Sequence, residues 1–310
     1  MNSSACVSVN KLAFSYQSHK ALEGVDFEVA PGEVFGVLGP NGGGKTTLFR
    51  ILATLLSGYQ GEARILGFDL REQKQSVRSQ LGVVFQSPSV DPKLSVAENL
   101  RLHGSLYGRS GSNLERAVDG ALSRLGIDDR KNAWVETLSG GLKRRVELAK
   151  CLLSNPKILI LDEPSTGLDP GARLGLWEHI RTLRDNDGVT VLVTTHLMAE
   201  AERCDRLIIL DHGRVVSAGT PAELRSRIGG DVVTVRSANP EELAPRIERE
   251  VGQAPINLDG ALRLERSDGP MLVKQLIETF PDEIEEVSLA KPTLEDVFIR
   301  ETGHRFWSAP

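Results

Sequence analysis

The run Gly39–Thr47, which reads GPNGGGKTT, has the residue types and spacing of a phosphate-binding loop. Glycine has no Cβ, so successive backbone N–H groups can turn toward anionic oxygens and approach them closely. Lys45 adds a positive charge on a flexible stem. The run therefore predicts a nucleotide site, although glycines by themselves would also suit a flexible turn.

The segments that flank this run favour the nucleotide site. Residues 33–38 are typical of a buried strand, and apolar residues recur at helical spacing after the run, at Leu48, Ile51, Leu52 and Leu55. A loop between a strand and a helix lies at the positive end of the helix dipole. We expect bound phosphates to contact the loop itself, namely Gly39, Asn41, Gly42, Gly43, Gly44, Lys45, Thr46 and Thr47.

Two carboxylates, Asp162 and Glu163, end an apolar strand that starts near Lys157. Removing an unpaired carboxylate from water is costly, so both acids need a cation, a water molecule or hydrogen-bond donors. A magnesium ion held for nucleotide phosphates meets this need. Asp162 and Thr46 would be its ligands, and Glu163 would face the attacking water.

Gln86 and His196 also end apolar strands. In α/β sheets the carboxyl ends of strands line the ligand crevice. Gln86 is therefore a candidate to reach a metal ion or water, and His196 to contact a phosphate. A solvated loop glutamine and a structural histidine are the ordinary alternatives.

A second candidate anion site lies where a later helix begins. Ser139, Gly140 and Gly141 offer a hydroxyl and backbone amides to an anion, and an ordinary helix cap is the alternative. Upstream, Ser95 and Glu98 form a capping box, which predicts a mostly helical stretch over residues 95–132.

The beginning of the chain is rich in β-structure. Residues 7–16 and 25–30 alternate apolar and polar side chains, and residues 59–68 and 207–216 are typical of hairpins. Tyr16 either packs within its strand or stacks on a nucleotide base. The residues alone leave both interpretations open.

The composition indicates a globular chain, since 40% of the 310 residues are hydrophobic and 25% are charged. A net charge of −5 provides no basic field, so we expect no nucleic-acid partner. Cys6, Cys151 and Cys204 are widely spaced, which suits structural thiols in a reducing compartment. No apolar run reaches the roughly 18 to 20 residues of a bilayer-spanning helix, so we expect no membrane segment.

Together these motifs resemble the ATP-binding cassette (ABC) family, the nucleotide-hydrolysing subunits of ABC transporters. The resemblance covers about residues 5–228 and includes the LSGG run at residues 138–141, which looks like the family signature. It implies an α/β fold, a P-loop NTPase cassette with a mixed-sheet core, an antiparallel β-subdomain and a helical subdomain. The ligands that it implies are ATP and Mg²⁺.

The resemblance also implies roles for individual residues. Tyr16 matches the aromatic residue that stacks on adenine, and Ser139, Gly140, Gly141 and Asp169 match nucleotide contacts of the signature and the D-loop. The metal-binding positions match Thr46, Gln86 and Asp162. The catalytic positions match Glu163, His196, Lys45 and Gln86. Because every hydrolytic position is filled, we expect an active ATPase.

Position 142 departs from the family pattern. The signature usually continues LSGGQ, whereas Leu142 stands at the place of the glutamine. Members of the drug-export branch often carry an apolar residue there, followed by basic residues, and Lys143, Arg144 and Arg145 look like that variant. We expect binding of the γ-phosphate to survive, because Ser139 and the glycine amides remain.

Beyond Gly229 and Gly230 the sequence predicts a small accessory α/β domain over residues 231–303, followed by a tail over residues 304–310. Strands are expected near residues 232–236, 262–266 and 284–289, helices near 240–251 and 270–280, and a last helix from Thr293. The closing PTLEDVF resembles the C-terminal extension of ABC-2-type export ATPases, which serve drug, polysaccharide and lipid exporters. We hypothesise that this domain supports dimerisation or regulates closure.

In the family, two cassettes face head to tail, and each ATP lies between the loop of one and the signature of the other. We therefore expect a homodimer on the cytoplasmic side of the cell membrane that drives export through a separate transmembrane permease subunit. The alternative is a soluble ABC ATPase that acts on ribosomes or chromosomes, but its coiled-coil insertion or tandem cassette is absent from the sequence. A P-loop GTPase or kinase would leave the LSGG run unexplained.

Overall fold

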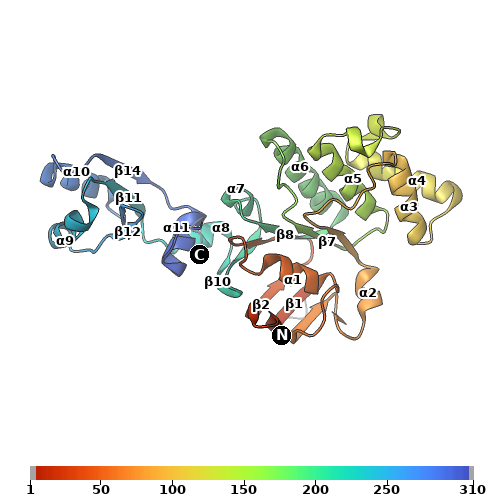
Figure 1. Ribbon diagram of the computed structural model, residues 1–310, viewed down its shortest axis with the longest axis horizontal. Helices are drawn as coiled ribbons and strands as arrows, with labels where there is room; N and C mark the ends of the chain where they lie inside the picture. Colours follow the sequence, from red (N-terminus) through yellow and green to blue (C-terminus); the bar gives the residue numbers. More distant parts are fainter. Residues whose placement is uncertain (1–4, 307–310) are drawn as a thin grey trace. The chain divides into compact units, whose positions relative to one another are not determined.

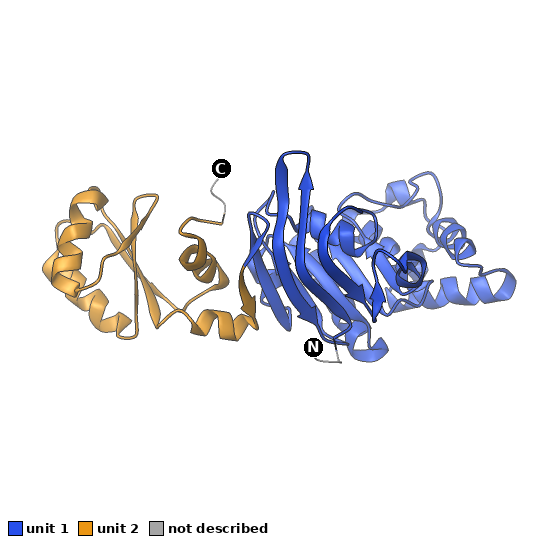
Figure 2. Ribbon diagram, turned by 90° about the horizontal axis from the view of Figure 1, so that it is seen from below, with its two compact units in different colours: residues 1–215 blue, residues 216–310 orange. Residues whose placement is uncertain are grey.

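The computed structural model describes residues 5–306. The chain divides into two compact units, with the boundary between Val215 and Val216, and each unit is described by itself (Figure 2). Residues 307–310 of the expected tail lie outside the described residues. Within residues 5–306, no helix has both the length and the apolar character needed to cross a bilayer.

An antiparallel sheet opens the first unit. Its strands lie in the order β2-β1-β4-β5. Their bounds are β1 Val7–Tyr16, β2 His19–Val29, β4 Gln60–Ile65 and β5 Phe68–Asp69. Val25, Phe27 and Val29 of β2 are buried while the residues between them face outward, as the alternation of the sequence predicts.

A six-stranded sheet, mostly parallel, forms the centre of the first unit, and its edge strand β10 continues past Val215 into the second unit (Figure 1). The strand order is β10-β9-β3-β8-β7-β6. The bounds are β3 Val34–Leu38, β6 Leu81–Val84, β7 Ile158–Asp162, β8 Thr190–Thr195, β9 Arg206–Asp211 and β10 Arg214–Gly219. β3 pairs in parallel with β8 and β9, and β7 with β6 and β8. The carboxyl ends of β3, β6, β7 and β8 therefore share one edge of the sheet.

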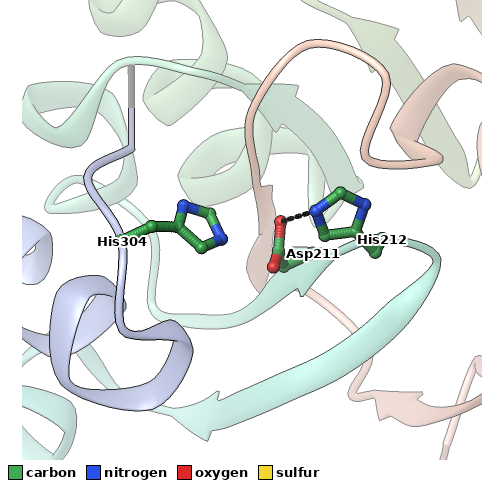
Figure 3. Close-up of side chains that lie close together, drawn as sticks. All are labelled: Asp211, His212 and His304. Carbon is green, nitrogen blue, oxygen red and sulfur yellow. Dashed lines mark ion pairs between the residues drawn. The ribbon is translucent and has the colours of Figure 1, made fainter. Parts of the chain in front are cut away.

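The turn between β9 and β10 supports the phosphate loop. It consists of His212 and Gly213, within the hairpin predicted over residues 207–216. Figure 3 shows the Asp211 carboxylate beside the His212 ring, with Oδ1 and Nε2 3.9 Å apart. The Gly213 amide donates to the Gly43 carbonyl oxygen at 3.1 Å. A backbone hydrogen bond thus joins this turn to residues of the GPNGGGKTT run.

Helices cover the sheet and form a separate layer in which α3, α4 and α5 contact one another (Figure 1). The bounds are α1 Lys45–Leu52, α2 Lys74–Arg78, α3 Val96–Leu106, α4 Gly111–Arg124, α5 Gly140–Leu152, α6 Pro170–Asp187 and α7 Met198–Ala201, with 3₁₀ turns at η1 Asp128–Arg130 and η2 Val135–Thr137. The capping box predicted at Ser95 and Glu98 is confirmed at the start of α3.

The prediction that Leu55 continues the first helix is wrong. α1 ends at Leu52, and the Leu55 side chain is 58% exposed. Thr54 has a φ of 62°, and a residue in the left-handed region commonly ends a helix. Backbone conformation at one residue therefore interrupts an apolar spacing that would otherwise continue.

The second unit contains an antiparallel sheet in the order β12-β13-β11-β14. The bounds are α8 Pro221–Ser226, β11 Asp231–Arg236, α9 Pro240–Val251, β12 Ile256–Leu258, β13 Ala261–Arg266, α10 Gly269–Thr279, β14 Glu286–Ala290 and α11 Leu294–Thr302. The small α/β fold is confirmed. The strand β12 was not predicted, because three residues are too few to show a periodic pattern.

A buried arginine organises the second unit. Arg263 of β13 is 5% exposed, and its guanidinium lies 2.8 Å from Asp296 Oδ1 and 3.1 Å from Glu265 Oε1. Asp296 also completes the capping box of α11 with Thr293. One carboxylate of the PTLEDVF segment therefore neutralises a buried charge and holds the start of the last helix.

Replacing Asp296 with alanine should lower the free energy of unfolding of the second unit by about 3 kcal/mol, because a buried charge loses a partner and a helix loses a cap. The matched control is Glu295→Ala, which removes the other first-turn acid of α11 and should cost about 0.5 kcal/mol. Urea denaturation followed by circular dichroism measures both. Equal losses would contradict the role assigned to Asp296.

Candidate functional site

Gly44 sets the geometry of the phosphate loop. Its φ is 103°, and a Cβ at this position would lie 2.5 Å from the carbonyl oxygen of Ala21. Any other residue would be strained here. Gly44 is also the N-cap of α1 and has no side chain to occupy the first amides of that helix, which favours an anion at this end.

Lys45 lies within the loop and is only 4% exposed. Its Nζ donates to the carbonyl oxygens of Gly39 at 2.8 Å and Pro40 at 3.0 Å, and lies 3.2 Å from Glu163 Oε1. Burial lowers the pKa of Lys45, while the carboxylates of Glu163 and Asp162 act in the opposite direction. The ammonium group is thus surrounded by oxygen atoms at the carboxyl edge of the sheet.

Asp162, the last residue of β7, is 1% exposed. Its Oδ1 accepts a hydrogen bond from the Thr194 hydroxyl at 2.6 Å and one from the Thr46 hydroxyl at 3.4 Å. The Thr194 oxygen in turn accepts from the Glu163 backbone N–H at 2.8 Å. One hydroxyl of β8 therefore positions both Asp162 and Glu163, a role that no pattern in the sequence indicated.

Glu163 adopts a φ of 47°, in the left-handed region that residues other than glycine seldom occupy and that is enriched at functional sites. Its Oε2 lies 3.1 Å from His196 Nδ1 and accepts from the Thr166 hydroxyl at 3.2 Å. Burial raises the pKa of Glu163, but Lys45, His196 and Thr166 together outweigh it and hold the pKa below its usual value. Glu163 is therefore an ionised carboxylate between two basic groups.

These side chains surround a cleft of about 480 Å³. Most of the predicted site residues line it: Tyr16, Asn41, Gly42, Gly44, Lys45, Thr46, Thr47, Gln86, Glu163 and His196. The cleft also receives His19, Ala21 and Thr166, which the sequence analysis did not anticipate. The sequence could have indicated Thr166, because its hydroxyl lies in the loop that follows the two acids. His19 and Ala21 lie near Tyr16 because they follow it across a β-hairpin.

Three predicted residues lie beneath the cleft or at the base of the loop. Asp162 is buried below Thr46. The Gly39 amide donates to the Thr195 carbonyl oxygen at 3.3 Å, and the Gly43 amide donates to the Pro40 carbonyl oxygen at 3.2 Å. Their backbone bonds hold the loop against β8 and close its turn.

The predicted signature and D-loop residues lie elsewhere on the first unit. Ser139 is the N-cap of α5, and its hydroxyl accepts from the Leu142 amide at 3.4 Å. Asp169 caps α6 by accepting from the Ala172 amide at 2.9 Å. A Cβ on Gly141 would lie 2.7 Å from the Ala172 Cβ, so the N-terminal ends of α5 and α6 touch. Among the residues that the structure describes, this group lines a different surface from the cleft.

Leu142 packs against the hydrophobic core of the helical layer. This contact is a physical reason for an apolar side chain where the family usually has glutamine. The N-cap bond of Ser139 is made to the backbone of residue 142, so it does not depend on that side chain.

The strand order completes the definition of the site. A glycine loop follows β3, two acids end β7, and β8 lies between these strands and carries Thr194 and His196 at or just after its end. A lysine-containing loop facing strand-end carboxylates across one strand is the arrangement of a P-loop nucleotide-binding protein.

Comparison with known proteins makes the assignment specific. A family model described as ABC transporter matches residues 22–166, and one described as ATP-binding protein DrrA1-3-like, C-terminal domain, matches residues 219–302. The Nod factor export ATP-binding protein I of Paraburkholderia xenovorans is 41% identical over 79% of this chain and 82% of its own. The daunorubicin resistance ATP-binding protein DrrA3 of Streptomyces coeruleorubidus is 36% identical over 93% of each chain.

Solved structures agree with these relatives. The dimeric structure of an ATP-binding cassette in a post-hydrolysis state, bound to ADP and Pi, covers 69% of this chain and 98% of its own, with 27% identity and a TM-score of 0.63. The chain belongs to the ABC transporter family. The predicted cassette fold and the predicted function, an ATP-hydrolysing subunit of an ABC exporter, are confirmed, and the ribosome or chromosome alternative is not favoured.

Replacing Glu163 with glutamine should change the pH dependence of the protein's stability. The native pKa of Glu163 lies below its unfolded value, so the carboxylate stabilises the fold above the unfolded pKa, and this contribution is lost as pH falls through the native pKa. The melting temperatures of the parent and of Glu163→Gln should converge as pH falls from about 7 to about 3. Thermal melts across this range measure it. A difference in melting temperature that stays constant with pH would contradict the ion pair with Lys45. The control is Glu178→Gln, at an exposed acid of α6.

Proposed function

We propose that two copies of this chain form a head-to-tail dimer that holds each ATP between the glycine loop of one copy and the α5 N-terminus of the other. The observation that carries this proposal is the separation of two anion-binding features on one chain. The loop with Lys45 lines the cleft, whereas Ser139, Gly140 and Gly141 open a helix on another surface. Helix N-termini attract anions, so each α5 can complete the partner's site at the γ-phosphate. The dimeric cassette among the solved relatives supports this arrangement.

ATP would bind along the cleft from its mouth to the buried acids. Tyr16 is 41% exposed and would stack on adenine. The glycine loop and the first amides of α1 would bind the phosphates, and Lys45 would exchange its contact with Glu163 for a phosphate oxygen. This exchange would leave Glu163 free to contact water.

The residues below the loop fit a magnesium ion. Thr46 and Asp162 place a hydroxyl and a carboxylate oxygen 3.4 Å apart, and hard oxygen donors are the ligands that magnesium prefers. Gln86, which lines the same cleft, would be a further ligand. When bound, the ion would neutralise charge on the phosphates.

Hydrolysis would proceed by in-line attack of water on the γ-phosphorus. Glu163 would accept the proton of that water as its oxygen bonds to phosphorus and the bond to the ADP oxygen breaks, with ADP and phosphate as products. Lys45 would stabilise the charge on the equatorial oxygens. His196 and Thr166, both within 3.2 Å of Glu163 Oε2, would keep the carboxylate oriented.

The dimer would work with a membrane partner. We propose that ATP-driven closure and hydrolysis-driven opening move a separate transmembrane permease subunit, and that the dimer lies on the cytoplasmic side of the membrane. Relatives named for Nod factor export and daunorubicin resistance support export of a small molecule, whose contacts would lie in the permease. The accessory α/β domain, over residues 231–303, would support dimerisation or regulate closure.

Replacing Glu163 with glutamine should reduce kcat for ATP hydrolysis by about 100-fold or more, because the general base is lost while the phosphate contacts remain. ATP affinity should change by less than about threefold. Steady-state phosphate release and equilibrium nucleotide binding measure the two quantities in the presence of the membrane partner. Hydrolysis at the parent rate would remove Glu163 from its proposed role, and Glu178→Gln is again the exposed control.

Replacing Ser139 with alanine should lower ATPase activity by about tenfold or more, since the shared site loses a donor to the γ-phosphate. It should also cost about 1 kcal/mol of stability, because α5 loses its N-cap. Ser95→Ala is the matched control: it removes the N-cap of α3 at similar cost and should leave hydrolysis unchanged.

Mixing the two impaired variants tests the shared site directly. In a mixed dimer of Ser139→Ala and Glu163→Gln chains, one site combines an intact loop with an intact signature. The mixture should therefore regain up to about a quarter of the parent activity, since about half of the dimers are mixed and one of their two sites is complete. A mixture no more active than its components would contradict the head-to-tail arrangement.

A further inference from the structure

Helix α5 (Gly140–Leu152) carries polar side chains that face the loop after β6. Arg144 and Glu147 are 6% and 2% exposed, and Arg144 Nη1 lies 2.9 Å from Glu147 Oε2. The sequence placed Arg144 in the basic run after the signature, where a solvated cation would be ordinary. Its burial is unexpected, because an arginine and a glutamate are rarely buried together unless the pair serves a structural or functional need.

The remaining hydrogen bonds of this pair go to backbone and side-chain groups of residues 85–89. Arg144 Nη1 donates to the Phe85 carbonyl oxygen at 2.8 Å, and Nη2 donates to the Gln86 carbonyl oxygen at 3.5 Å. Glu147 Oε1 accepts from the Ser89 amide at 2.6 Å and from the Ser89 hydroxyl at 3.2 Å. The pair therefore holds the loop on both sides of Gln86.

Two further residues of α5 strengthen the contact with β6 and its loop. Lys150 Nζ donates to the Ser89 carbonyl oxygen and, at 3.2 Å, to the Ser89 hydroxyl. The Cys151 thiol lies 3.4 Å from the Val83 carbonyl oxygen. Because one face of the helix contacts this segment at several successive turns, a shift of α5 must move the loop with it.

The two ends of this contact belong to different parts of the proposed catalytic cycle. Arg144 lies about one helical turn from Gly140, at the N-terminus proposed to receive the partner's γ-phosphate. Gln86 lines the cleft that holds the chain's own nucleotide. The buried pair is thus a short, rigid connection between the two proposed anion sites of one chain.

We propose that Arg144 and Glu147 are positioning residues. They couple the position of Gln86 in the cleft to the position of the N-terminal end of α5, which carries the signature. This inference rests on the proposed function, since it assigns the link to the ATP cycle of the dimer. Binding of the partner's γ-phosphate at Ser139 displaces α5, and the buried pair carries that displacement to the loop of Gln86. Engagement of one site then alters the metal and water contacts of the other.

The key variant replaces the pair with apolar side chains, Arg144→Met with Glu147→Leu. Apolar replacements of a buried ion pair are often neutral or stabilising, so the variant should fold with a melting temperature within about 5 °C of the parent. It lacks every hydrogen bond from this pair to residues 85–89. Glu147→Gln is a milder second variant that keeps an oxygen for the Ser89 amide and removes the charge.

The first measurement is amide hydrogen exchange of residues 85–90 in the nucleotide-free full-length chain. Exchange of the Ser89 amide should rise by about tenfold or more in the double variant and by less in Glu147→Gln. The control is Lys143→Met, which removes a neighbouring cation whose Nζ donates to the Glu136 carbonyl oxygen, and it should leave this segment unchanged. Unchanged exchange in the double variant would overturn the link whether or not the chain hydrolyses ATP.

The second measurement is ATP hydrolysis as a function of ATP and Mg²⁺ concentration. The double variant should lose about tenfold in kcat and need more Mg²⁺ for half-maximal rate, while KM for ATP changes less than about twofold. Adding Gln86→Ala to the double variant should not lower kcat further. Substitutions that act through the same residue do not have additive effects. Full additivity with Gln86→Ala, or the same loss in Lys143→Met, would overturn the positioning role. A parent chain without ATPase activity would count against the proposed function. Hydrogen exchange at residues 85–90 would still show whether Arg144 and Glu147 hold the loop of Gln86.

Discussion

The nucleotide site depends on the ion pair between Lys45 and Glu163. Both residues are buried, at 4% and 8% exposed, and their charged atoms lie 3.2 Å apart. Neither charge could be buried alone without a large loss of solvation. The pair requires that the loop after β3 and the end of β7 approach each other, and the strand order allows this because only β8 lies between them. The polar residues at the end of β8 then fill the space between the loop and the acids.

A second buried carboxylate supports the strand ends that carry the catalytic candidates. Glu200 of α7 is 2% exposed, and it accepts hydrogen bonds from the Thr195 hydroxyl at 2.6 Å and from the Ser165 hydroxyl. Thr195 directly precedes His196, and Ser165 lies in the loop that follows Glu163. One carboxylate therefore ties both segments to the same short helix. Functional side chains keep their geometry best when such hydrogen bonds hold the backbone that carries them.

The first unit carries the proposed hydrolytic groups and the signature residues in two different places. The cleft around Lys45 and Glu163 contains the groups proposed to hydrolyse ATP, whereas Ser139 and Asp169, at the touching N-termini of α5 and α6, do not line it. In the proposed head-to-tail dimer the partner would complete each site, so hydrolysis would depend on closure. The buried pair Arg144–Glu147 would add a connection within each chain. In the proposed cycle, closure and opening of the dimer would move a membrane partner.

Local patterns in the sequence were sufficient to predict the glycine loop, the acids after β7, the cap at Ser95, the start of a helix after Ser139, and most helices and strands. These features depend on neighbours within a few residues, through hydrophobic periodicity, backbone conformation and helix capping. The small α/β fold of the second unit was expected from such local patterns and is confirmed, whereas the confirmed cassette fold was expected from the resemblance to the ABC family. Where a local pattern failed, as at Leu55, a single left-handed residue interrupted it.

The tertiary structure decided which distant residues meet. No spacing in the sequence shows that Thr194 bridges Asp162 and Glu163, that Thr166 contacts Glu163, or that Arg144 is buried against the loop of Gln86. Those contacts follow from strand order and from the packing of α5 on β6, which sum many weak interactions between segments far apart in the chain. The sequence by itself determined the chemistry available to the site, and the packing of the elements decided how that chemistry is arranged.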